Sequence, residues 1–192
     1  MILDLVRHGD TGRAGHLDGR IDPPLLPDAL GPVVARHHGI PWSRIISSPL
    51  QRARGTAAAL VGRELREGEI DSRWAEFDFG DWDGLVAGDV PAEALRDFHR
   101  DPLRHGPPGA EPWSGFTARV RSAVADLLPE AGADPVLVVT HGGPVRTVLA
   151  DICGLGLSAT WSVRIGYGTR VRVWVQDSDA GLWGEVLELT QP

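Results

Sequence analysis

Two short hydrophobic segments that lead into the same dipeptide constrain the fold of this chain most. Residues 2–6 lead into Arg7 and His8, and residues 135–140 lead into His141, with a glycine after each histidine. Apolar runs of this length, bounded by turn residues, are typical of buried strands in a parallel sheet. In open α/β sheets, ligands bind beyond the carboxyl ends of the strands. The pattern therefore predicts that the two histidines face one pocket, although they lie far apart in the sequence.

The glycines and the proline after the second histidine point in the same direction. A single His-Gly at a strand end is most often a half-buried structural histidine, but two copies in matching contexts favour a shared site. Glycine lets the backbone turn sharply or approach a ligand closely. Pro144 follows Gly143 and is expected to begin a helix, whose free N–H groups and positive dipole end would suit an anion.

The remaining segments predict an α/β fold. A short strand is expected at 45–46, and a β-hairpin is expected from strands at 170–175 and 183–189 around a turn at 177–181. Helices are expected over about 28–38, 50–65, 116–128 and 144–154. Strands that alternate with helices indicate a three-layer sandwich, in which helices cover both faces of a mainly parallel sheet with an antiparallel edge.

Capping signals and the absence of a linker complete the predicted organisation. Ser48 is expected to be an N-cap with Pro49 at the first helical position, and Ser114 or Gly115 is expected near the next cap. We expect one domain over residues 1–192. Residues 84–112, rich in glycine and proline, are expected to form an insertion over the site at one end of the sheet.

Composition narrows the partners and the compartment. The formal net charge is −7, which argues against nucleic acid or an anionic membrane as partner. No apolar run has the length that crosses a bilayer. Cys153 is the only cysteine, so no intramolecular disulfide forms and a cytoplasmic location is expected. Every basic residue apart from the histidines is an arginine, so a cation that binds an anionic substrate must be arginine.

Four segments, in order along the chain, resemble the motifs of the histidine phosphatase superfamily, which has the phosphoglycerate-mutase-like fold. They are RHGDT at 7–11 with GRIDPPL at 19–25, SSPLQRA at 47–53, EFDFGDWDG at 76–84 and VTHGGPVR at 139–146. The chain departs from the family pattern at Asp10, where Glu or Gln is usual, and at Ala29, where Gly is usual. Neither departure affects the groups that carry the chemistry.

The resemblance implies a role for each site residue. His8 would be the nucleophile that takes a phosphoryl group and then gives it to water. Arg7 and Arg52, with His141 and Gly142, would bind the phosphate; the two arginines would also keep His8 neutral near pH 7. Glu76 would be the general acid that protonates the leaving alkoxide.

Other interpretations of the arginines and of the nearby acidic residues stay open at this point. Arg7, taken alone, is consistent with a surface cation at a strand end. Arg52, taken alone, is better explained as a residue on a solvated helix face. Three nearby aspartates could replace Glu76 or simply form a solvated acidic loop; they are Asp78, Asp81 and Asp83. With two arginines for the phosphate, we expect no metal and no cofactor.

The segment after Glu76 most resembles α-ribazole phosphatases, so we expect a small-molecule phosphomonoester, with α-ribazole 5′-phosphate of cobalamin biosynthesis as the first candidate. Four aromatic residues would line the pocket or pack in the core: Trp74, Phe77, Phe79 and Trp82. A broad sugar-phosphate or nucleotide phosphatase is the nearest rival. A phosphoglycerate mutase is less expected, because the chain has no asparagine and residues 76–83 are acidic.

Other classes are also weighed. A regulatory phosphatase for protein phosphohistidine would use the same residues. A two-metal phosphoesterase is disfavoured because the chain has no His-x₃-His spacing and no asparagine. A non-catalytic binding protein is disfavoured because all the catalytic positions are filled. Residues 161–167 and the C-terminal hairpin are consistent with a homodimer contact and equally with packing inside the fold.

Overall fold

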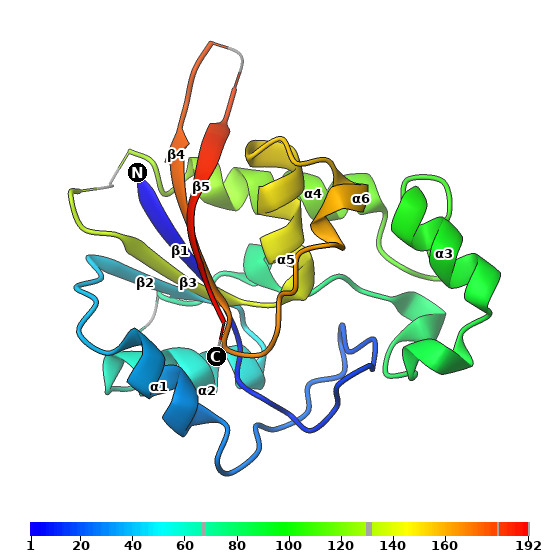
Figure 1. The fold of residues 1–192 in the computed structure, drawn as a ribbon, viewed down its shortest axis with the longest axis horizontal. Helices are drawn as coiled ribbons and strands as arrows, with labels where there is room; N and C mark the ends of the chain where they lie inside the picture. The colour runs from blue at the N-terminus through cyan, green and yellow to red at the C-terminus, as the bar shows by residue number, and fades with distance from the viewer. Residues whose placement is uncertain (67, 130–131, 180, 192) are drawn as a thin grey trace.

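A mixed five-stranded sheet forms the centre of the protein in the computed structural model, which describes residues 1–66, 68–129, 132–179 and 181–191. The strands are β1 (Ile2–Arg7), β2 (Arg44–Ser47), β3 (Val136–Thr140), β4 (Arg170–Gln176) and β5 (Trp183–Thr190). Their order is β2-β3-β1-β4-β5 (Figure 1). The β1–β3 and β2–β3 pairs are parallel, whereas β4 and β5 pair antiparallel. The predicted antiparallel edge is thus confirmed; Ala180, in the predicted turn, lies outside the described residues.

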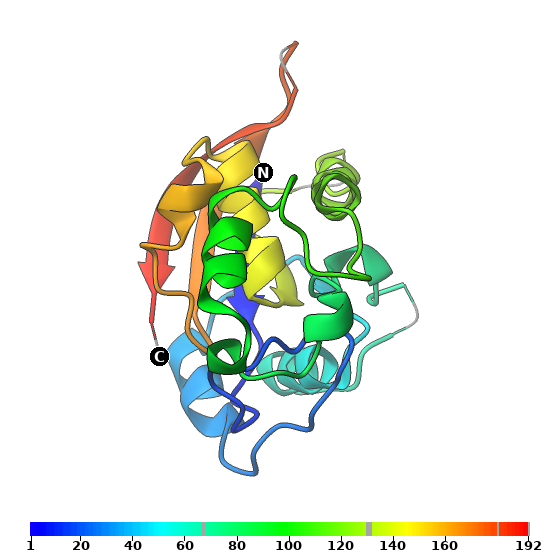
Figure 2. The same cartoon turned by 90° about the vertical axis from the view of Figure 1, so that its right-hand side faces the viewer.

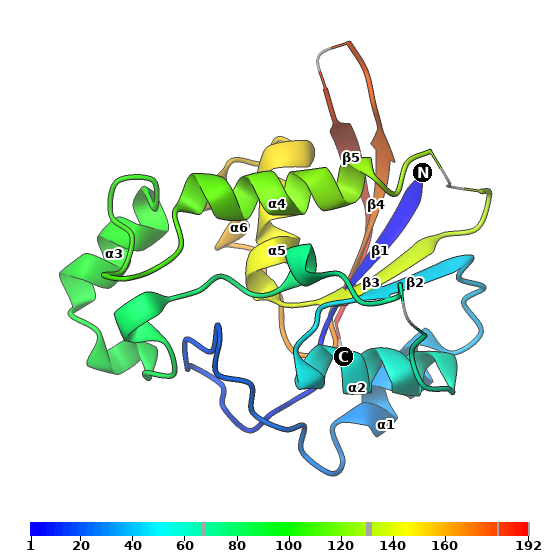
Figure 3. The ribbon, with the colours of Figure 1, turned by 180° about the vertical axis from the view of Figure 1, so that it is seen from behind.

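Helices cover both faces of the sheet, as predicted. They are α1 (Leu30–His37), α2 (Gln51–Val61), α3 (Ala92–Arg100), α4 (Trp113–Ala125), α5 (Gly142–Thr147) and α6 (Leu157–Thr160). Alternate residues of a strand point to opposite faces. Leu3 and Leu5 of β1 accordingly belong to the core beneath α4 and α5, and Val6 belongs to the core beneath α2. Figure 3 shows α4 on one side of the sheet and α1 with α2 on the other.

The helix boundaries correct two of the predicted caps. α2 begins at Gln51 with Leu50 as its N-cap, so Ser48 does not cap it. α2 ends at Val61 and not at residue 65. Its C-cap is Gly62, whose left-handed φ of 67° suits glycine. α4 begins at Trp113, which places Ser114 and Gly115 inside the helix instead of at its cap. The cap signal at Ser48 misled because this side chain serves the site described below.

The segment over 84–112 contains a helix that the sequence did not predict. Its glycines and prolines surround α3, and Phe98 on that helix is only 3% exposed. Phe98 packs among Phe77, Phe79 and Trp113, with ring centroids 5.7 to 6.2 Å apart. α3 also contacts α6 (Figure 2). The aromatic cluster therefore holds this segment against the body of the protein.

The register of β1 and β3 places the site. Arg7 lies beside Thr140, so the chain leaves both strands at the same edge of the sheet. α5 begins immediately after His141 and continues as a wider π-helical turn over Val148–Ile152. Within the described part of the chain, no helix has both the length and the hydropathy that a membrane crossing needs.

Candidate active site

The two parallel strand ends bring His8 and His141 together. The His8 N–H donates to the Thr140 carbonyl at 2.9 Å, which continues the β1–β3 ladder. The two imidazole centroids lie 5.0 Å apart with the rings tilted by 59°. His8 is 5% exposed and His141 is fully buried. The prediction that the two histidines meet at one edge of the sheet is therefore confirmed.

The hydrogen bonds of His8 fix which ring nitrogen is free. Nδ1 lies 2.8 Å from the Gly9 carbonyl, and because a carbonyl oxygen only accepts, Nδ1 must carry the proton. This leaves the Nε2 lone pair available. Burial first, and then the charges of Arg7 and Arg52, hold the pKa of His8 well below its usual value. His8 is therefore neutral near pH 7 and able to act as a nucleophile.

A short hydrogen-bonded chain ties the loop after His8 to α2. The Gly9 N–H donates to Thr56 Oγ1 at 2.9 Å, and the Thr56 hydroxyl donates to the Arg52 carbonyl at 2.8 Å. Thr56 and Arg52 lie one turn apart on α2 and are both buried. The backbone after His8 is thus held at a fixed position relative to the Arg52 guanidinium.

Arg7 is held by a carbonyl and an aromatic ring. Its Nη1 donates to the Ile165 carbonyl at 2.7 Å, and its guanidinium carbon lies 4.2 Å from the centroid of Tyr167. Its Nε is buried without a partner in the described part of the chain. Burial lowers the pKa of Arg7, but a guanidinium stays protonated in proteins. Arg7 therefore keeps a charge and unused donors beside His8.

Arg52 is a buried cation, which excludes the alternative of a solvated helix face. Its side chain is 1% exposed. Nη1 donates to the Ile21 carbonyl and, at 3.0 Å, to Asp22 Oδ1, while Nη2 donates to the Asp18 carbonyl at 2.8 Å. Nε has no partner among the described residues. The residues after the first motif thus fix this guanidinium with one N–H group still available.

Arg7, His8 and Arg52 line a cleft of about 70 Å³, which we call the phosphate cleft. It is lined by Arg7, His8, Thr11, His16, Asp18, Arg52, Glu76, Phe79 and Tyr167. This volume well exceeds the ~10–15 Å³ that one water molecule requires. Among the described residues, no cluster of three or more His, Cys, Asp or Glu side chains is arranged to hold a metal ion. The cleft therefore presents cations and a nucleophile to a small anionic group.

Glu76 enters the phosphate cleft from the segment that follows the core residue Trp74. Both of its carboxylate oxygens lie 3.1 Å from the Gly143 nitrogen, and Oε1 also accepts the Phe77 N–H at 2.9 Å. A Cβ atom at position 143 would lie 2.1 Å from Oε1. Glycine at this position is therefore needed for the carboxylate to stand where it does.

The three nearby aspartates have other surroundings. Asp83 accepts the backbone N–H groups of residues 19–21 at 2.6 to 3.2 Å. Asp78 accepts Arg20 Nε at 3.0 Å and the Gly80 N–H at 3.0 Å. None of the three, Asp81 included, lines the phosphate cleft. Asp78 and Asp83 thus hold the 19–21 loop in place. These contacts fit neither a replacement for Glu76 as the acid nor a solvated acidic loop.

His141 and Gly142 lie beside the phosphate cleft and not in its lining. His141 Nε2 is 2.7 Å from Ser48 Oγ, whereas its Nδ1 is buried without a partner in the described part of the chain. Burial, together with His8 and the arginines, keeps the pKa of His141 well below its usual value. Gly142 lines the adjoining pocket instead. Ser48 therefore serves the buried ring and not the helix cap.

The adjoining pocket, which we call the alcohol pocket, has a volume of about 180 Å³ and shares Arg7, Glu76 and Phe79 with the phosphate cleft. Its other lining residues are Leu17, Phe77, Phe98, His99, Trp113, Gly142, Gly143, Arg146, Trp161 and Ile165. Only part of the predicted aromatic wall is present. Phe77 and Phe79 line this pocket, but Trp74 is fully buried and Trp82 lines a different recess.

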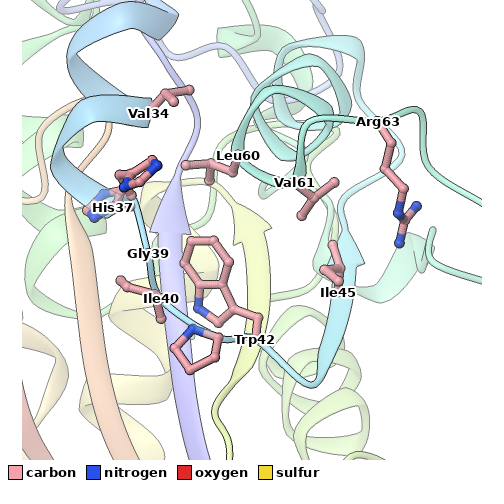
Figure 4. A pocket seen from close by; sticks show the side chains of 11 residues that line it. Val34, His37, Gly39, Ile40, Trp42, Ile45, Leu60, Val61 and Arg63 are labelled. Carbon is pink, nitrogen blue, oxygen red and sulfur yellow. The ribbon is translucent and has the colours of Figure 1, made fainter.

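A larger recess of about 380 Å³ lies between α1, β2 and α2, away from both histidines of the site (Figure 4). Its lining includes Trp42, aliphatic side chains and His37. His37 Nε2 donates to the Gly168 carbonyl at 3.1 Å, and the Gly168 N–H donates in turn to the carbonyls of Arg7 and His8. No predicted site residue lines this recess, so it is separate from the chemistry.

The structure adds site residues that the sequence did not single out. Tyr167 stacks on Arg7, Ser48 contacts His141, and Gly143 holds Glu76. Thr11, His16 and Asp18 line the phosphate cleft. Ser48 and Gly143 stand within the quoted motifs, where their position was a usable signal. Tyr167 is the only tyrosine of the chain, but nothing in its neighbourhood indicates a site.

Comparison with known proteins agrees with this geometry. The model of the histidine phosphatase superfamily (branch 1) matches residues 3–183. A glucosyl-3-phosphoglycerate phosphatase of Mycolicibacterium vanbaalenii is 31% identical over 205 residues, which cover 96% of this chain and 90% of the relative. An adenosylcobalamin/alpha-ribazole phosphatase of Salmonella typhimurium is 29% identical over 177 residues, which cover 88% and 87%.

A solved structure extends the similarity to the fold. The native structure of a mycobacterial glucosyl-3-phosphoglycerate phosphatase superposes with a TM-score of 0.79 at 28% identity, and the match covers 96% of both chains.

Proposed function

This chain belongs to the histidine phosphatase superfamily and is a phosphatase, and on that premise we propose that it hydrolyses small phosphomonoesters through a phosphohistidine on His8. One observation carries the proposal: a neutral imidazole with a free Nε2 stands in a cleft that two guanidinium groups also line. Planar guanidinium groups suit the oxygens of a phosphoryl group because they stay charged and donate in pairs.

The first half-reaction uses these groups in order. His8 Nε2 attacks phosphorus, an N–P bond forms, and the ester P–O bond breaks. Arg7 and Arg52 offer positive charge to the phosphoryl oxygens as this happens. Glu76, which lines both the phosphate cleft and the alcohol pocket, gives its proton to the leaving alkoxide.

The second half-reaction reverses the proton transfer. A water molecule attacks the phosphohistidine, Glu76 takes one of its protons, and the N–P bond breaks to release inorganic phosphate. His8 regains its Nε2 lone pair. His141, buried 5.0 Å from His8, would hold the nucleophile in place and donate to the phosphate once the substrate is bound.

Two substrates are candidates. α-Ribazole 5′-phosphate, the candidate from the sequence, is supported by the aromatic residues of the alcohol pocket, which suit a flat base. Glucosyl-3-phosphoglycerate is supported by the similarity over almost the whole chain. A protein-borne phosphohistidine is a weaker candidate, because His8 is only 5% exposed. We also infer that residues 84–112 close one side of the alcohol pocket, since His99 and Phe98 of α3 line it.

Trapping the intermediate tests the proposal. Brief incubation with ³²P-labelled phosphomonoester and alkaline quenching should leave acid-labile phosphate on the protein. His8→Ala should abolish this label and lower kcat by about 10⁴-fold or more. His38→Ala, which changes an exposed histidine away from the site, is the matched control and should keep both. Label that survives in the His8→Ala protein would contradict the proposal.

The role of Glu76 has its own test. Glu76→Gln keeps the shape of the side chain but cannot supply the proton. It should slow the release of poor leaving groups, such as alkyl alcohols, far more than the release of p-nitrophenol. Equal effects on both substrates would exclude Glu76 as the general acid.

A further inference from the structure

Arg146 brings a third guanidinium group to the site, on the side of the leaving group. It lies on α5, five residues after His141, and lines the alcohol pocket together with Glu76. Its guanidinium carbon stands 4.5 Å from the ring centroid of Trp161. His99 stacks on the same ring with centroids 4.2 Å apart. The alcohol pocket thus contains a second fixed cation besides Arg7.

The hydrogen bonds of Arg146 leave one edge of the guanidinium unused. Nη1 donates to the carbonyls of Thr160 and Val163, which anchors the group to α6 and the turn after it. In the described part of the chain Nε and Nη2 have no hydrogen-bond partner, and no carboxylate there forms an ion pair with Arg146. Other arginines in the described part of the chain do pair with acidic side chains, for example Arg119 with Glu111 at 2.7 Å.

The charges around Arg146 favour an anionic ligand in this pocket. Burial and the nearby Arg7 lower the pKa of Arg146, and Glu76 opposes them. The carboxylate of Glu76 is already held by the Gly143 N–H and must carry a proton to serve as the acid. A carboxylate that pairs with this half-buried guanidinium would add charge-assisted hydrogen bonds to the contacts that Arg146 already makes. An anionic ligand would supply the counterion.

The size of the pocket and its donors limit what this anion is. The alcohol pocket is small and apolar over most of its lining, and on the side away from the shared Arg7 it offers the guanidinium edge of Arg146. A second phosphate dianion would need several further donors, whereas a carboxylate needs only the paired N–H groups of one guanidinium. The pocket adjoins the phosphate cleft at Arg7, Glu76 and Phe79, so the two anionic groups would belong to one small molecule.

We propose that the alcohol half of the substrate carries a carboxylate, which pairs with Arg146 while its carbon skeleton lies against Trp161 and Phe79. This inference rests on the proposed function, since it requires that the phosphate cleft holds the phosphoryl group. It makes Arg146 a specificity-determining residue. The acidic residues 76–83 argue against a substrate with several negative charges. Under this proposal Arg146 of α5 supplies the additional cation that such a substrate needs.

Two substrates that differ only at the relevant group give the sharpest test. 3-Phosphoglycerate carries a carboxylate where glycerol 3-phosphate carries a hydroxymethyl group. The intact wild-type protein should show a kcat/KM at least about 10-fold higher for 3-phosphoglycerate. In Arg146→Met this ratio should fall by about 10- to 100-fold, because a charge-assisted hydrogen-bonded pair is worth ~1.5–3 kcal/mol. Arg146→Lys should recover part of the ratio.

Controls separate the possible failures. Arg96→Met removes the same charge from an exposed site on α3 and should leave the ratio unchanged. If wild-type protein hydrolyses neither p-nitrophenyl phosphate nor either substrate, the proposed function is wrong. If it hydrolyses p-nitrophenyl phosphate but does not prefer 3-phosphoglycerate, or if Arg146→Met and Arg146→Lys keep the wild-type ratio, only the carboxylate subsite is wrong. Thermal unfolding of each variant shows whether it is folded.

Discussion

The phosphate cleft and the alcohol pocket share a wall but differ in how the chain builds them. In the cleft, His8 follows β1 directly, and Arg52 stands in the first turn of α2 with its guanidinium tied to three backbone carbonyls and Asp22. In the pocket, α3, α6 and the connecting segments supply rings that contact mainly one another. The cleft is thus held by hydrogen bonds from the sheet edge, and the pocket by aromatic packing.

This difference separates chemistry from selection. A group held by several directional hydrogen bonds loses its geometry with almost any substitution, and every substrate is affected equally. An apolar wall tolerates change better, because packing is less directional, and its effects depend on the alcohol that touches it. Substitutions in the cleft should therefore lower all rates together, whereas substitutions in the pocket should change the order of substrates.

The largest effect is expected in the cleft. Arg52→Lys keeps a charge but loses the planar fork that reaches Asp22 and the carbonyls of Asp18 and Ile21. We expect kcat/KM to fall by about 10²–10³-fold for every phosphomonoester. Arg54→Lys, on the exposed side of the same helix, is the matched control. A loss for some substrates only would contradict a cleft that acts on all of them.

Gly143 joins the two regions, because it holds the carboxylate that serves both. Gly143→Ala would place a Cβ 2.1 Å from Glu76 Oε1 and push that side chain away. We expect kcat to fall by about 10- to 100-fold for alkyl leaving groups, and less for p-nitrophenol, since acid catalysis contributes ~10²–10⁴-fold. Gly115→Ala, within α4 and without close neighbours, is the control. A uniform loss would mean that Gly143 shapes the cleft and not the acid.

A substitution in the alcohol pocket should change kcat/KM for some substrates more than for others. Trp161→Ala removes the ring that contacts Arg146 and His99. We expect kcat/KM to fall by about 10-fold for substrates with large alcohols and by less than about twofold for the smallest, measured over a substrate panel. Trp183→Ala, which removes an indole of similar exposure on β5, should change neither. Equal losses across the panel would show that this wall does not select.

The smallest expected effect is on the pH dependence of stability, and it arises from the two histidines at the phosphate cleft. Folding lowers the pKa of His8 and of His141, mainly by burial. Below pH ~6.5 the unfolded chain therefore binds protons that the folded protein does not bind, so stability rises with pH and falls on acidification. Between pH 7.5 and 5.5 we therefore expect the free energy of unfolding, measured by urea unfolding, to fall as the unfolded chain takes up these protons.

A variant isolates this contribution from that of the carboxylates. His8→Asn removes one of the titrating groups, so the free energy of unfolding should fall less steeply between pH 7.5 and 5.5 than in the wild type. Identical slopes would show that His8 takes up its proton in the folded protein as readily as in the unfolded chain.

The sequence predicted the cleft better than the pocket, and the physical reason is local. His8 and His141 follow regular apolar strands, so the period and the end of each strand locate them. Arg52 and Glu76 came from motif resemblance, because their surroundings are formed by segments distant in sequence. The pairing of β1 between β3 and β4 could not be read from either strand alone.

The parts that were missed depend on tertiary packing. α3 lies in a segment of glycine and proline whose helix is stabilised by the burial of Phe98 and not by its own capping. Ser48 carries a strong capping signal, but its hydroxyl is used by His141. Arg146 stood inside a quoted motif, yet its free edge became visible only once α6 supplied the carbonyls for Nη1.

The position of β1 in the sheet has a consequence for biosynthesis. β1 precedes its two neighbours by a long stretch of chain, because β3 and β4 begin at residues 136 and 170. During translation the apolar β1 segment therefore stays unpaired until the segments that form β3 and β4 have been synthesised. Such distant pairing slows folding and exposes the nascent chain to aggregation. We expect catalytic competence to appear only after β3 and β4 have left the ribosome, so activity would report that both strands have paired with β1.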